Sequence, residues 1–143
     1  MRTPAVRFHV LGSIAVVTAA LAAAVPARGN PPPAWTVTDV QRAEKNPASP
    51  TGESTARGRA LYTKNCHACH GATGDGKGPV ATRLGFSAGD LTGGDEMAKK
   101  TDGELFWKIV LGRDPMPAFR KEKGLSDPQI WDVVNYVRTL TTK

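Results

Sequence analysis

The sequence predicts an all-α fold, and three observations support this prediction. Apolar residues recur at helical spacing in three segments, residues 53–65, 101–112 and 126–140. No segment alternates apolar and polar residues over a length that a convincing sheet would need. The segments between the helical patterns are rich in glycine and proline, which favour loops. We therefore expect a helical domain of three to four helices.

The first 27 residues have the pattern of an export signal. Arg2 and Arg7 supply positive charges, an uncharged apolar run extends from residue 10 to residue 25, and small residues before position 28 offer a cleavage site. No Arg-Arg pair is present, which favours the general secretory route. The apolar run is at the short end of the roughly 20 residues that a spanning helix needs. We therefore predict cleavage and a periplasmic location, with residues 10–27 retained as a membrane anchor as the alternative.

Residues 28–52 are predicted to form a proline-rich extended arm. Five prolines interrupt a segment with few apolar groups, which favours polyproline conformation and little regular structure. Trp35 and Val37 are apolar exceptions that can pack back onto the domain. Residues 53–143 are assigned to one domain, which is long enough to bury a modest core.

The helical pattern at residues 53–65 contains Gly58, with Tyr62 one turn later. A glycine inside a helix costs about 1 kcal/mol relative to alanine. We therefore interpret Gly58 as a position where another helix crosses close to the backbone. The expected partner is the last helix of the chain.

Two further helices are marked by capping signals. Thr101 and Glu104 have capping-box spacing, and Gly112 is placed to end the helix that follows. Ser126 and Gln129 have the same spacing at the start of the last helix. A continuous apolar stripe follows Gln129, so one face of this helix must be buried.

The most informative motif of the chain is the run Cys66-His67-Ala68-Cys69-His70. A Cys-x-x-Cys-His pentad is typical of the attachment site of a c-type haem. Two thiols three residues apart on a helical turn can each form a thioether with a haem vinyl group, while the adjacent His70 faces the iron. These are the only two cysteines, so no four-cysteine metal site can form. A thioredoxin-like pair is the alternative, but it would require a βαβ pattern.

A haem held by His70 has one further axial position, and its ligand decides between electron transfer and ligand chemistry. Met116 lies between two prolines, which restrict the backbone and can hold a thioether in a fixed presentation. Met97 has no flanking prolines, and Met1 belongs to the expected signal. We therefore predict one covalently attached haem c with His70 and Met116 as its axial iron ligands.

Over about residues 55 to 141, the chain resembles the class I cytochromes c in their small bacterial form. The resemblance rests on residues in four places: Gly58 and Tyr62, the pentad, the Met116-Pro117-x-Phe119 loop, and Trp131 to Tyr136. It implies a cytochrome c fold wrapped around one haem, with terminal helices that cross near a right angle. It also suggests that the Pro79 carbonyl, or another loop carbonyl in its place, accepts a hydrogen bond from the His70 ring, which would fix the imidazole.

Other side chains near these motifs are given minor roles. His67 is interpreted as exposed and functionally idle, because the chemistry of the pentad does not constrain its position. Tyr62, Trp107 and Phe119 are interpreted as packing groups of the haem pocket and not as redox relays.

The charge balance limits the classes of partner. The chain carries 19 basic and 13 acidic residues, a net charge of +6, which becomes +4 without Arg2 and Arg7. This balance does not imply nucleic-acid binding. Basic side chains between residues 64 and 123 fit either docking to an acidic redox partner or an ordinary solvated surface.

The leading hypothesis is a periplasmic monohaem electron carrier without enzymatic activity. It would transfer single electrons between redox proteins. One alternative is a membrane-tethered cytochrome subunit of an oxidase or dehydrogenase complex. A gas-binding haem sensor or haem enzyme is a further alternative, and the sequence gives it little support.

Overall fold

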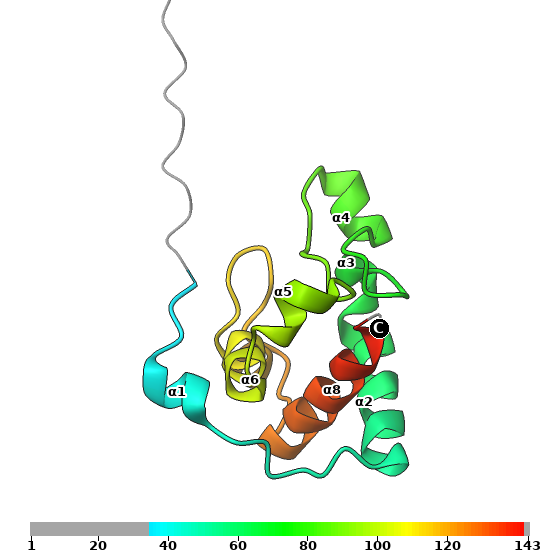
Figure 1. Cartoon of the computed structure of the whole chain (residues 1–143). Helices are drawn as coiled ribbons and strands as arrows, with labels where there is room; N and C mark the ends of the chain where they lie inside the picture. The colour runs from blue at the N-terminus through cyan, green and yellow to red at the C-terminus, as the bar shows by residue number, and fades with distance from the viewer. Residues whose placement is uncertain (1–34, 142–143) are drawn as a thin grey trace, which may run out of the picture. The chain divides into compact units, whose positions relative to one another are not determined.

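The computed structural model describes residues 35–141, so the expected export signal and the first residues of the arm lie outside the described residues. Within this range the chain forms eight helices and no strand. One isolated β-type bridge joins Arg113 and Met116. The helices, shown in Figure 1, are α1 (Asp39–Ala43), α2 (Gly52–Asn65), α3 (His67–His70), α4 (Pro79–Leu84), α5 (Gly94–Ala98), α6 (Asp102–Leu111), α7 (Phe119–Glu122) and α8 (Asp127–Leu140).

The predicted all-α fold is thus confirmed for the described residues, and the three predicted helices correspond to α2, α6 and α8. Five shorter helices accompany them. No helix within residues 35–141 combines the length and the apolar character that crossing a bilayer requires. The suggested anchor at residues 10–27 lies outside this range.

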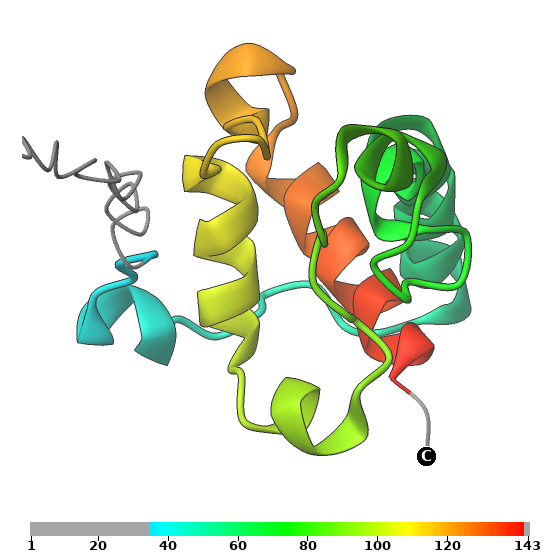
Figure 2. The same cartoon turned by 90° about the horizontal axis from the view of Figure 1, so that it is seen from above.

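Helices α2 and α8 cross in the most extensive helix–helix contact of the described residues, and they are side by side in both views (Figures 1 and 2). Gly58 makes this approach possible, because a Cβ atom at this position would overlap the carbonyl group of Asp132. One turn further along, the rings of Tyr62 and Tyr136 pack with their centroids 5.2 Å apart. The interpretation of Gly58 as a helix-crossing position is confirmed.

The α8 helix begins as its capping signal predicts and buries one face. The Ser126 amide donates to Gln129 Oε1 at 2.9 Å, and the reciprocal capping box is present. Trp131 of this helix stacks on Phe106 of α6, with ring centroids 4.0 Å apart. The remaining buried apolar residues of α8 are Ile130, Val133, Val134 and Val137.

A buried polar cluster also joins α2 to α8. The Ser54 hydroxyl donates to Asp132 at 2.6 Å, and Asn135 donates to the Ser54 oxygen at 2.8 Å. Arg57 adds a second donor to the Asp132 carboxylate at 2.8 Å. Burial alone would raise the pKa of Asp132, but the hydrogen bonds from Arg57 and Ser54 outweigh burial and lower it. Asp132 is therefore held as a carboxylate with its hydrogen bonds satisfied.

The expectation of little regular structure between residues 28 and 52 is wrong for α1. Thr38 and Gln41 form a reciprocal capping box, and the Thr38 amide donates to Gln41 Oε1 at 2.9 Å. This Thr-x-x-Gln signature is present in the sequence. The proline content of the surrounding segment concealed it. The domain boundary near residue 53 stays a prediction.

The α1 helix lies beside α6 in both views (Figures 1 and 2). Arg42 forms an ion pair with Glu104, and the Trp107 indole donates to Glu44 at 2.7 Å. Gly103 lets the two backbones meet, since a Cβ atom there would contact the Gln41 and Glu44 carbonyl oxygens. We call residues 35–44 the N-terminal strap.

Arg138 of α8 fixes the connection between α5 and α6. Its guanidinium donates to the carbonyls of Met97 at 2.8 Å and Lys100 at 2.5 Å, and to the Asp102 carboxylate at 2.8 Å. These contacts place Met97 in the core, where only 2% of its surface is exposed. Helix α5 has only five residues, so its position depends on these tertiary contacts more than on its own helical hydrogen bonds.

Candidate functional site

The pentad forms a single helical turn that continues from α2. Cys66 ends α2, and the amides of Cys69 and His70 both donate to its carbonyl, at 3.1 and 2.9 Å. Both thiols are free and partly buried. The turn therefore brings two sulfur nucleophiles and one imidazole together, as the motif predicts.

Two adjoining cavities lie against this turn. Their volumes are about 170 and 110 Å³. The first reaches the apolar side chains of α6 and α8, and the second reaches the loop before α7. The residues that line both are Trp35, Cys66, His70, Ala88 and Met116.

All four predicted site residues line the second cavity: Cys66, Cys69, His70 and Met116. Two of the predicted packing groups also contact the cavities, since Tyr62 lines the first and Phe119 the second. The fold thus gathers residues that are separated by up to 50 positions in the chain around one space.

The backbone of the Met116 loop is tied back on itself. The Arg113 amide donates to the Met116 carbonyl at 2.9 Å, and the Met116 amide donates to the Arg113 carbonyl at 2.7 Å. Phe119 anchors the following turn, with 3% of its surface exposed. These contacts, together with the flanking prolines, hold the half-buried Met116 side chain beside the cavities.

Met97 contributes to the site in a way that the sequence did not reveal. It lacks flanking prolines, but its buried side chain lines the first cavity with Met116. It does not line the second cavity, where both thiols lie. Tertiary contacts, among them the hydrogen bond from Arg138 to the Met97 carbonyl and packing in the core, bring Met97 to the cavity, and no local signal in the sequence indicated this.

Burial controls the protonation of the groups at this site. Burial, with a smaller contribution from Cys69, raises the pKa of the Cys66 thiol to about 12. Burial also raises the pKa of Tyr62, whose hydroxyl donates to the Gly71 carbonyl at 2.7 Å. Burial lowers the pKa of His70, and the Gly89 backbone opposes this effect only in part. Each of these groups is therefore held in its neutral form, as an apolar cavity requires.

The expected hydrogen bond between His70 and Pro79 is not present. The His70 Nδ1 atom is buried and has no hydrogen-bond partner within residues 35–141. Pro79 is the first residue of α4, and the Gly78 amide before it donates to the Cys69 carbonyl at 3.0 Å. The start of α4 thus lies beside the pentad, but the Pro79 carbonyl does not take the role that the resemblance implied.

Two minor assignments are also corrected. His67 is partly buried and not exposed, because its ring packs on α2 and Nδ1 donates to the Thr63 carbonyl. Trp107 lines neither cavity, because its indole faces the N-terminal strap and donates to Glu44 at 2.7 Å.

The all-helical fold and the pentad define a monohaem c-type cytochrome domain. Comparison with family models agrees: residues 53–137 match the family described as cytochrome c oxidase, cbb3-type, subunit III. Because the match covers more than half of the chain, the chain belongs to this cytochrome c family.

A solved structure with a similar fold comes from the Kuenenia stuttgartiensis reducing HAO-like protein complex Kustc0457/Kustc0458. The two sequences are 31% identical, with a TM-score of 0.55. The alignment covers 67% of this chain and 47% of that chain, so the similarity extends over less than half of the solved relative. A comparison with curated proteins found no match.

Proposed function

We propose that the chain is an electron-transfer protein that carries one haem c, attached through Cys66 and Cys69 with His70 and Met116 as axial ligands. The observation that carries this proposal is that all four side chains line one cavity. The free thiols, the imidazole and the thioether are the donor set that a covalently attached haem needs. When bound, haem c supplies reversible one-electron exchange at its iron.

The chain's own residues then set the properties of the site. Apolar side chains from α6 and α8 line the first cavity and exclude water from it. A low-polarity environment and a thioether ligand both favour the reduced state, so this residue set supports a raised reduction potential. No bond-making step by a side chain is needed, which supports a carrier and not an enzyme.

Replacement of Met116 by alanine tests the ligand assignment. In this variant we expect carbon monoxide to bind the reduced protein readily and the reduction potential to fall, because the sixth position is opened. Met97→Ala is the matched control, since it removes a methionine that lines only the first cavity. Gas binding in the Met97 variant with no change in the Met116 variant would reject Met116 as the ligand.

Covalent attachment is tested separately. The wild-type chain should keep its haem on a denaturing gel, and the double variant Cys66→Ala/Cys69→Ala should lose it, because thioether bonds survive denaturation and axial bonds do not. A wild-type chain without haem in a host that matures c-type cytochromes would contradict the proposed cofactor.

We also propose export to the periplasm after cleavage of residues 1–27. Two redox roles remain: a diffusing carrier, and a tethered subunit of a redox complex. The family's description as an oxidase subunit and the relative's place in a complex support the second role. Fractionation separates them, since a soluble product that begins near Arg28 indicates a carrier, whereas release from membranes only by detergent indicates a retained anchor.

In either role, the partner is proposed to be a redox protein with an acidic docking surface. The basic side chains of the chain would supply the complementary charge, and such contacts weaken with added salt. The rate of electron exchange with the partner should therefore fall as the ionic strength rises.

A further inference from the structure

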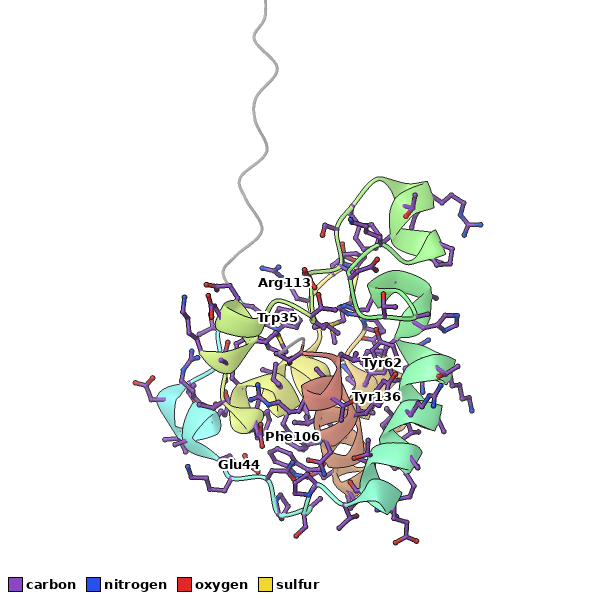
Figure 3. The ribbon with its side chains drawn as sticks, turned by 45° about the vertical axis from the view of Figure 1, so that its right-hand side comes forward. Trp35, Glu44, Tyr62, Phe106, Arg113 and Tyr136 are labelled. Carbon is purple, nitrogen blue, oxygen red and sulfur yellow. The ribbon has the colours of Figure 1, made fainter. Side chains whose placement is uncertain are left out.

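Trp35 of the N-terminal strap lies at the junction of the two cavities. It lines both of them and is half-buried. Its ring is contacted by two cations, with Lys108 Nζ 5.5 Å and Arg113 Cζ 5.1 Å from the ring centroid. Figure 3 shows Trp35 and Arg113 next to one another.

The indole nitrogen of Trp35 is buried but has no hydrogen-bond partner within residues 35–141. An indole nitrogen can only donate, and a buried donor without an acceptor destabilises the folded protein. Trp107 provides the contrast in the same region, because its indole donates to Glu44 at 2.7 Å. Trp35 therefore lacks the acceptor that Trp107 has.

The charges around Trp35 indicate what kind of acceptor is missing. Arg113 makes no ion pair among residues 35–141, although it lines the second cavity. Lys108 lines the first cavity and is paired with Glu104 at 2.6 Å. One unpaired cation and one orphaned N–H group beside the same cavity are complementary to a carboxylate.

We propose that Trp35 and Arg113, with Lys108 beside them, bind a propionate carboxylate of the haem. This inference rests on the proposed function, because it requires haem in the cavities. Trp35 lies outside the family match, which covers residues 53–137, whereas Arg113 and Lys108 lie within it. The N-terminal strap would thus complete the cofactor site with a hydrogen-bond donor that the matched segment does not contain.

Contacts with α6 hold Trp35 in this position. The Thr101 hydroxyl donates to the Arg42 carbonyl at 2.5 Å, and Arg42 and Glu44 both have side-chain partners on α6. Val37 is buried, with 6% of its surface exposed, only two residues after Trp35. The strap is therefore docked on both its backbone and its side chains, which fixes the indole beside the cavity.

The same contact reaches the axial loop. The backbone of Arg113 exchanges two hydrogen bonds with the backbone of Met116, the proposed iron ligand. The side chain of Arg113 contacts the Trp35 ring. Binding of a propionate by Trp35 and Arg113 would therefore join the strap, the cofactor and the Met116 loop in one set of contacts.

The test compares Trp35→Phe and Arg113→Gln with the wild-type holoprotein. Phenylalanine keeps an aromatic ring and removes only the N–H donor, and glutamine removes the charge. Arg59→Gln is the matched control, because Arg59 is exposed on α2 and lines neither cavity. The measurements are the reduction potential at low ionic strength and the indole N–H signals in nitrogen-15 spectra of oxidised and reduced protein.

We expect a lower potential in both test variants, because an unshielded propionate stabilises the oxidised haem. For Arg113→Gln, the equilibrium constant for reduction should fall about threefold, which is about 30 mV for a one-electron couple. The potential of the Arg59→Gln control should stay unchanged. The Trp35 indole signal is the one that disappears in Trp35→Phe. In the wild-type protein, its N–H proton should exchange slowly with solvent, and its chemical shift should differ between the two oxidation states.

Unchanged potentials in both test variants, with haem covalently bound, would overturn this inference and leave the proposed function intact. A wild-type chain without covalent haem would overturn both. If Trp35→Phe does not fold, Arg113→Gln decides alone, because that side chain is exposed and its replacement leaves no buried gap.

Discussion

The α2–α8 crossing and the cavity face, as we call the residues that line the two cavities, differ in how completely their buried polar groups find hydrogen-bond partners within the protein. At the crossing, Asp132, Ser54 and Asn135 all have hydrogen-bond partners, and the helices meet without space at Gly58. At the cavity face, the buried nitrogens of Trp35 and His70 have no partner within residues 35–141. The crossing is thus complete with protein atoms alone, whereas the cavity face fits a protein that is completed by a bound group.

The largest expected effect on stability comes from a substitution that disrupts the α2–α8 crossing. Gly58→Val should destabilise the holoprotein by about 3 kcal/mol, because the new side chain must displace the Asp132 carbonyl and thereby the α8 backbone. Denaturant unfolding of purified holoprotein measures this change. Haem should stay covalently bound, since the two cysteines that would form the thioethers belong to the cavity face and not to the crossing.

Gly52→Ala is the control on the same helix. Gly52 is the first residue of α2, and a Cβ atom added there would have no neighbouring atom within 4 Å, so alanine fits without displacement. We expect the free energy of unfolding to change by less than about 1 kcal/mol, in either direction. Equal losses in the two glycine variants would show that the crossing is not the source of the effect.

Asp132→Ala tests the buried polar cluster of the crossing and should lower the free energy of unfolding by about 2 kcal/mol. The substitution leaves the buried Ser54 hydroxyl without its acceptor, and such an unsatisfied group carries a penalty of this size. Urea unfolding midpoints of wild type and variant give the difference. Recovery of most of the loss in Asp132→Asn, which keeps an acceptor oxygen, would identify the hydrogen bond as the cause.

The pH dependence of stability follows from two carboxylates, Asp132 of α8 and Glu104 of α6. The pKa values of Asp132 and Glu104 lie below their ordinary values of 3.8 and 4.5, because their hydrogen-bonded partners outweigh burial. The stabilisation is therefore complete above about pH 4.5 and is lost as the pH falls through the lowered values. Unfolding measured from about pH 6 to pH 3 should show this loss, with a flatter profile for Asp132→Asn.

The smallest expected effect lies where the N-terminal strap docks on α6. Glu44→Ala removes the acceptor for the Trp107 indole and should lower the free energy of unfolding by about 0.5 kcal/mol, because the bond is exposed to solvent. Cleavage of the N-terminal strap by protease should become faster. Glu53→Ala is a control for an exposed glutamate, and equal protease sensitivity in the two variants would contradict the docking of the strap.

Local signals in the sequence predicted the long helices well. Ser126 and Gln129 set the start of α8, and Thr101 accepts from the Glu104 amide at 3.1 Å at the start of α6. Glu104 does not complete the expected reciprocal box, because its carboxylate pairs with Arg42 and Lys108 instead. Capping depends on residues a few positions apart, which is why sequence alone located these helix ends.

The missed features are of two kinds. Helix α1 carries a readable capping box at Thr38 and Gln41, and the proline-rich composition outweighed it in our prediction. Met97 gave no such signal, and for Trp35 the sequence predicted packing onto the domain but not a place beside the cavities. Their places beside the cavities depend on Arg138 and on the docking of the strap against α6, and these contacts join residues far apart in the chain.

The sequence by itself determined the class of this protein, because the pentad confines its two thiols and imidazole to one helical turn and because helix caps and apolar stripes are local patterns. It also identified Gly58 as a close crossing. The tertiary structure alone decided what else surrounds the pentad: Trp35 and Met97 beside the cavities, Trp107 turned to the strap, and His70 without the hydrogen bond expected from Pro79. The physical reason is that these placements are set by packing and hydrogen bonds between distant segments, which no local pattern encodes.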